Sequence, residues 1–156
     1  MSEDRPGFYL PLLLAGAFRA LVDDLHVELE RYGHGGARPV HGFALQAIGP
    51  HGATISELGR RLGVSKQAAA KTANSLEQVG YVVRQADPDD ARATVLVRSA
   101  RGEEMLALSA KVFEELRGAW ASQLGIDRLR RMEDDLEGLV AGAGGAKVGD
   151  LPGWLR

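Results

Sequence analysis

The chain has 156 residues, 45% of them hydrophobic and 26% charged, with a mean hydropathy of -0.14. These values are typical of one soluble domain, or one domain with a dimerising appendage, and exclude a disordered or fibrous chain. The absence of cysteine excludes disulfides, thiolate zinc sites and thiol-based catalysis or redox sensing. No apolar run approaches the ~20 residues that span a bilayer, and Glu3 and Asp4 stand where an export signal has basic residues, so we expect a cytoplasmic protein with no membrane partner.

Charge is distributed unevenly along the chain, although the net charge is only -2 and the pI about 6.1. Residues 54–101 carry eight Lys/Arg against five Asp/Glu, residues 1–53 carry four against six, and residues 102–156 carry seven against ten. A basic centre between acidic flanks is typical of a DNA-reading module on an acidic scaffold, but an excess of this size alone decides little.

The first third of the chain predicts helices. Apolar residues at spacings of three and four indicate a long amphipathic helix over residues 8–32, and after a Gly-rich break a shorter helix follows over residues 40–48. A third helix is predicted to begin at Thr54, where Thr-x-x-Glu forms a capping box, and to end near Leu62.

A fourth helix follows after a short turn. Ser65 is placed to cap it, and it extends to about Gln78, with Gly80 as a left-handed terminator. Gly59 is small enough for two helices to approach closely, and Gly63 tolerates the positive φ that the turn needs.

Two β-prone runs come next, at residues 81–83 and 94–97, on either side of a turn-rich loop at residues 87–92. They predict a β-hairpin. A helix over residues 103–123 follows, and Asp127 is expected to cap a last helix that ends near residue 140. The fold class predicted from this order is mainly α with a small β-hairpin wing, a winged helix-turn-helix.

The helix after Ser65 has one apolar and one polar face. At ~100° per residue, the polar face holds the residue types that read base edges: Gln and Asn pair with adenine, Lys reaches guanine or phosphate, and Ala touches a thymine methyl. Ser65 and Lys66, at the amino end, are expected to fix register on phosphate. The candidate readers are Gln67, Ala70, Lys71 and Asn74. The alternative is a solvated polar face, which the neighbouring turn, caps and hairpin disfavour.

In the hairpin, we expect Arg92 to enter a narrow minor groove, with Asp90 holding it through a charge-assisted bond. The alternative is a plain surface turn, since Asp and Pro are common turn formers. Arg84 and Arg98, on the strands, are expected to contact phosphate or face solvent.

Three segments of the chain, residues 55–67, 76–82 and 87–92, resemble the MarR family of bacterial transcriptional regulators: ISELGRRLGVSKQ, LEQVGYV and DPDDAR. The similarity covers about residues 40–106. It implies a homodimer that reads a pseudo-palindrome in double-stranded DNA, commonly with repression relieved by a small ligand. The family's wing usually reads Asp-x-Arg-Asp-x-Arg, and here Asp89 replaces the first Arg, which weakens the expected wing contact.

The resemblance divides the chain into four parts. These are an N-terminal dimerisation helix and loop (1–39), the DNA-binding domain (40–101), C-terminal dimerisation helices (102–141) and a Gly-rich tail expected to be loosely ordered (142–156). Dimerisation is also reasonable physically, because one recognition helix buries too little surface for tight binding.

In the family, effectors often bind between the dimer helices and the winged module. The polar or aromatic residues that could line such a cleft here are Arg19, His26, Tyr32, His41 and Trp120. They suggest a phenolic or other aromatic effector. The alternative is that they are ordinary core residues, Trp120 above all.

Other functions have weaker support. No pair of the four histidines has the helical i, i+4 spacing of a strong zinc motif, so no metal or other cofactor is expected, and His34 and His51 are expected to be solvated in turns. Neither a nucleophile elbow nor a phosphate-binding loop is present, which disfavours an enzyme. A winged helix used for protein–protein contacts remains the alternative to DNA reading, since Asp89 and the overall acidity favour it.

Overall fold

The computed structural model describes residues 5–143. Its elements are α1 (Tyr9–Arg31), α2 (Pro39–Ile48), β1 (Ala53–Thr54), α3 (Ile55–Leu62), α4 (Lys66–Gln78), β2 (Val82–Ala86), β3 (Thr94–Arg98), α5 (Ala100–Leu124) and α6 (Ile126–Gly142). The expected mainly helical fold with a small β wing is confirmed. The tail predicted to be loosely ordered lies, from residue 144 on, outside the described residues.

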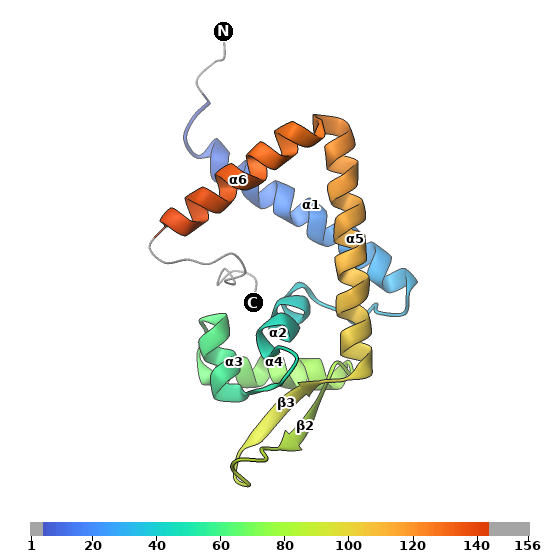
Figure 1. Ribbon diagram of the computed structural model, residues 1–156, viewed down its shortest axis with the longest axis vertical. Coiled ribbons are helices and arrows are strands. Elements are labelled where there is room, and N and C mark those ends of the chain that lie inside the picture. The colour runs from blue at the N-terminus through green and yellow to red at the C-terminus, as the bar shows by residue number, and fades with distance from the viewer. Residues whose placement is uncertain (1–4, 144–156) are drawn as a thin grey trace.

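The molecule has two ends joined by one long helix (Figure 1). α1 and α6 lie at one end, and α2, α3, α4 and the sheet lie at the other, while α5 extends from the sheet toward α6. Arg117 on α5 binds Glu133 on α6 through two hydrogen bonds of 2.7 and 2.8 Å, which fixes the corner between these helices. The shape separates a helical end from a winged end.

The sheet has three antiparallel strands in the order β1-β3-β2. The predicted hairpin is present, but β2 begins at Val82 and continues to Ala86, so Tyr81 precedes the strand as a fully buried residue. The sequence did not predict β1, in which Ala53 pairs with Leu96. Two residues are too few for periodicity to show.

The predicted caps of the helix-turn-helix are confirmed. Thr54 Oγ1 accepts from the Glu57 amide at 3.1 Å, and Glu57 Oε2 accepts from the Thr54 amide at 2.9 Å, a bond that lowers the pKa of Glu57. Ser65 Oγ accepts from the Ala68 amide at 3.1 Å and so caps α4. Gly63 has the positive φ expected of the turn, 65°.

Two predicted helix starts were wrong. α5 begins at Ala100, three residues earlier than expected, because the hydroxyl of Ser99 accepts from the Gly102 amide and caps it. α6 begins at Ile126, and Asp127 lies in its first turn without capping it. The chain reverses instead at Gly125, whose φ of 88° suits glycine.

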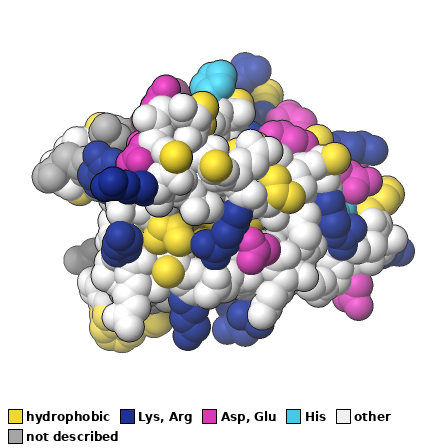
Figure 2. Space-filling model, turned by 90° about the horizontal axis from the view of Figure 1, so that it is seen from below, with side chains coloured by type: hydrophobic (Ala, Val, Ile, Leu, Met, Phe, Trp, Pro, Cys, Tyr) yellow, Lys and Arg dark blue, Asp and Glu magenta, His cyan; other side chains and the backbone are white. Residues whose placement is uncertain are grey.

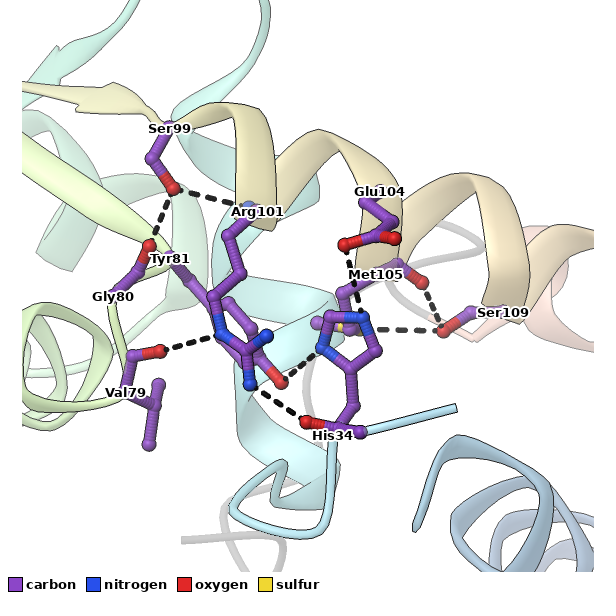
Figure 3. A network of polar contacts seen from close by, with 11 residues as sticks. His34, Val79, Gly80, Tyr81, Ser99, Arg101, Glu104, Met105 and Ser109 are labelled. Carbon is purple, nitrogen blue, oxygen red and sulfur yellow. Dashed lines mark hydrogen bonds and ion pairs between the residues drawn. The ribbon is translucent and has the colours of Figure 1, made fainter. Parts of the chain in front are cut away.

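His34, expected to be solvated, is buried, and this corrects the sequence prediction. Its Nδ1 lies 2.9 Å from the Tyr81 hydroxyl and its Nε2 3.5 Å from a carboxylate oxygen of Glu104 (Figure 3). Burial lowers the pKa of His34, the positive charge of Arg101 lowers it further, and Glu104 opposes both. The other turn histidine, His51, is exposed as expected.

Arg101, at the start of α5, completes this junction. It donates to the carbonyl oxygen of Gly33 at 2.8 Å and to that of Val79 at 3.2 Å, and so bridges the loop after α1 and the end of α4 (Figure 3). Gly102 packs so closely on the Tyr81 carbonyl that a Cβ would collide with it. The junction therefore holds the winged end and α5 in one fixed arrangement.

Candidate nucleic-acid interface

α3 and α4 form a closely packed helix-turn-helix. A Cβ on Gly59 would lie 3.1 Å from the Val64 carbonyl oxygen and 3.4 Å from the Ala69 Cβ, so the predicted close approach at this glycine is confirmed. Leu58 and Leu62 from α3 are buried against Ala69. This packing turns the opposite face of α4 outward.

The outward face of α4 carries the predicted reading residues. An open concave surface is lined by Ser65, Gln67, Ala68, Ala70, Lys71 and Asn74. The end of the molecule that carries the sheet is seen from below in Figure 2, where Lys and Arg side chains lie scattered among uncharged ones with fewer Asp and Glu. The structure thus brings the predicted α4 residues together on one surface.

The Lys and Arg side chains of the winged end differ in whether they are already bonded within the protein. Lys66, Lys71 and Arg92 have no carboxylate partner among the residues described. Arg98, expected to contact phosphate or face solvent, does not face solvent: its side chain is only 11% exposed and Nε donates to the Leu45 carbonyl at 2.8 Å. It satisfies a carbonyl near the end of α2.

Arg84 also differs from expectation, since it is bound to other side chains instead of facing solvent alone. It donates from Nε to Glu77 at 2.9 Å and from Nη2 to Asn74 at 2.7 Å. The sequence did not single out Glu77. Its spacing of three from Asn74 puts both on one helix face, but their shared partner on the next strand is visible only in the structure.

The tip of the wing is ordered by its own aspartates. Asp87 Oδ1 accepts from the Asp89 amide and Asp90 Oδ1 accepts from the Arg92 amide, both at 2.9 Å. The Asp90 carboxylate therefore holds the backbone of Arg92, and the expected bond to its guanidinium is not formed. This leaves the Arg92 cation available for an external partner.

Comparison with known proteins finds a family similarity over the winged module. Residues 38–93 match the MarR family, and the crystal structure of MarR superposes with a TM-score of 0.66 at 25% identity, covering 92% of this chain and 94% of the other. The family match covers α2, α3, α4 and β2, while α1, α5 and α6 lie outside it. The whole described chain shares the fold of MarR.

Two further structures resemble this chain. The transcriptional regulator Tm0710 from Thermotoga maritima is 27% identical, with a TM-score of 0.57 and coverage of 83% of this chain and 90% of that one. The S. aureus MepR–DNA complex is 18% identical, with a TM-score of 0.62 and coverage of 86% and 97%. Among curated proteins, none matches the chain.

A cavity of about 180 Å³ lies between α1, α2 and α5. Its walls are mostly apolar, and its polar or small lining residues include His26, Gln46 and Ser109. Of the five residues expected to line an effector cleft, His26 lines this cavity. Arg19 is exposed and paired with Asp23, Tyr32 is exposed, His41 is buried against α4, and Trp120 is half-buried on α5 away from these walls.

Within residues 5–143, no group of three or more His, Asp or Glu side chains could hold a metal ion. None of the helices in that range is both long and apolar enough to cross a membrane.

Proposed function

We propose that this protein is a homodimeric repressor that reads a pseudo-palindromic operator and is released from it by a small aromatic effector. The observation that carries the DNA part is the open concave surface on α4, which Gln67, Lys71 and Asn74 line and whose lining includes no acidic residue. Asn and Gln suit base edges, and Lys suits guanine or phosphate. MepR, which shares the fold, was solved bound to DNA.

The exposed apolar surface of α1 supports the dimer. Six large apolar side chains are exposed in the first turns of α1 or just before them, and Leu139 on α6 is 70% exposed. They are Phe8, Tyr9, Leu10, Leu12, Leu13 and Leu14. So much exposed apolar surface in one short segment is rare on a monomer. A second copy of the chain that covers it also supplies the second recognition helix that a pseudo-palindrome requires.

The cavity supports the proposal that an effector binds, because it lies where the helical end meets α2 of the winged end. His26 Nδ1 lies 2.7 Å from the Val22 carbonyl, which only accepts, so Nδ1 carries the proton and Nε2 is an acceptor. Nε2 is buried and has no partner among the described residues. A planar apolar molecule with one hydroxyl donor, such as a phenol, satisfies both the walls and this nitrogen.

The effector is tested by filling the cavity. Ala110 lines it, whereas the exposed Ala107 on the same helix does not. A panel of simple phenols should raise the melting temperature of the wild type and of the Ala107→Leu variant and release both from DNA. Ala110→Leu should abolish both effects. Equal responses of the two variants would place the effector elsewhere.

DNA reading is tested by mobility shift on duplexes selected from a random library, at two salt concentrations. Specific retention that weakens steeply with salt supports the regulator, because phosphate contacts release counterions. If no sequence is enriched, the winged module is used for protein contacts instead.

A further inference from the structure

Arg84 joins the wing to the recognition helix through two different side chains. From β2, its Nη2 donates to Oδ1 of Asn74 at 2.7 Å and its Nε donates to Oε2 of Glu77 at 2.9 Å. Asn74 and Glu77 lie three residues apart on α4 and so share a face of the helix. One guanidinium therefore bridges two acceptors, one of which belongs to a candidate base reader.

The chemistry of this bridge fixes the orientation of the Asn74 carboxamide. A guanidinium carries only N–H donors, so the Asn74 atom that faces it must be the carbonyl oxygen. The amino group, Nδ2, then lies on the other side of the carboxamide. Free asparagine can flip these two groups, but here a flip would place two sets of N–H donors against each other.

Glu77 keeps Arg84 in place. Its carboxylate forms a charge-assisted hydrogen bond with Nε, which is stronger and more directional than a neutral one. The pair is also partly shielded, since the side chain of Arg84 is 31% exposed. The Arg84 charge is thus already compensated within the protein, unlike the charges of Lys71 and Arg92.

We propose that Arg84 is a positioning residue for sequence reading: it holds Asn74 so that the recognition helix presents the Nδ2 amino donors to the major groove. This proposal rests on the proposed DNA-binding function. It specifies which bases Asn74 can recognise. Donors require an acceptor, which guanine offers at both N7 and O6, thymine at O4, and adenine only at N7, beside its N6 amino donor. Cytosine presents a donor there and is disfavoured, and the two-bond adenine pairing of a freely oriented asparagine is weakened because Arg84 already engages Oδ1.

A phosphate contact by Arg84 is the competing role, and it leaves a different signature. Loss of a phosphate contact weakens binding to all sequences alike and lowers the salt slope by about 1. Loss of a positioning contact changes the preferred base at one position and leaves the salt slope unchanged.

The test is selection from a random duplex library with the full-length wild type and three variants, each checked for folding by thermal unfolding. Arg84→Met removes the donors, and Asn74→Asp keeps the Arg84 bond but turns the free atom into an acceptor. Arg92→Ala serves as a matched loss of one wing cation that has no bond to Asn74.

We expect the wild type to prefer guanine or thymine at one position of each half-site. Asn74→Asp should move that preference to cytosine or adenine, whose amino groups donate. Arg84→Met should reduce the discrimination at that position by about fivefold or more, the low end expected of a good base contact, at unchanged salt slope. Arg92→Ala should keep the wild-type preference.

The outcomes separate this inference from the proposed function. If the wild type enriches a motif and Arg84→Met enriches the same motif with a smaller salt slope, Arg84 is a phosphate contact and the inference is wrong. The same holds if Asn74→Asp leaves the base preference unchanged. If the wild type enriches no motif, DNA reading itself fails and the positioning role falls with it.

Discussion

His41 on α2 is hydrogen-bonded through Nε2 to the hydroxyl of Ser75 on α4, with 2.8 Å between the two atoms. Its other nitrogen, Nδ1, accepts from the Arg38 amide at 3.0 Å. One neutral tautomer, with the proton on Nε2, satisfies both bonds. A second proton would have to occupy Nδ1, where it would face an N–H group. The bond therefore ties the recognition helix to α2 in a way that depends on protonation.

We predict that His41 makes stability fall in mild acid. Burial, then the positive charge of Arg38 and the neighbouring His26, lower the pKa of His41 from 6.5 to about 4. Between these two values the unfolded chain binds more protons than the folded one, so stability is full above the unfolded pKa and falls as the pH drops toward the folded one. The loss should be on the order of 2 kcal/mol.

Urea unfolding at several pH values between 7.5 and 4 measures this loss. The His41→Gln variant should lose less stability than the wild type over that range. His51→Gln, at an exposed position, should follow the wild type. Parallel pH profiles for the wild type and His41→Gln would show that another group carries the acid sensitivity.

The capping box of α3 should contribute measurably to stability. Thr54→Ala removes the hydroxyl that accepts from the Glu57 amide and should cost about 1 kcal/mol in denaturant unfolding. Ser56→Ala, two residues on and exposed within the helix, should be neutral or slightly stabilising. Equal effects of the two substitutions would mean that the cap contributes nothing.

Two glycines of α5 should respond to alanine in opposite ways. Gly118 has open space around its missing Cβ, so Gly118→Ala should stabilise the protein by about 0.5–1 kcal/mol. At Gly102 the added Cβ would collide with the Tyr81 carbonyl, and Gly102→Ala should destabilise by about 1–3 kcal/mol or more. A stabilising Gly102→Ala would show that α5 is free to move at the junction.

The wing should contribute to affinity more than to sequence choice. Arg92 has no ion pair in the described structure, so Arg92→Ala should weaken binding to all duplexes and lower the salt slope by about 1. Lys111→Ala, which removes one exposed cation from α5, should change neither quantity. Titrations of one duplex at several salt concentrations decide between these results.

Sequence predicted those parts of the fold that local chemistry determines. The capping box at Thr54, the cap at Ser65 and the left-handed turn at Gly63 are set within a few residues of chain, and each is found where expected. The start of α5 was misplaced because Ser99, whose hydroxyl caps it, follows a strand and has no apolar pattern around it.

What the sequence did not predict depends on contacts between distant residues. His34 looked solvated because its neighbours are glycines, and only the fold places Tyr81 beside it. Arg84 looked like a solvated or phosphate-binding cation because Asn74 and Glu77 meet it only after the strand packs beside α4. Residue types on one helix predicted the reading surface, but not the side-chain bonds that orient it.

The central claim is that two copies of this chain read two halves of one site. The most direct test is to select duplexes from a random library and to measure the protein-to-DNA ratio of the resulting complex. We expect an inverted repeat with half-site centres about 10 base pairs apart and two chains on each duplex. A single unrepeated site occupied by one chain, or no enriched sequence, would contradict it.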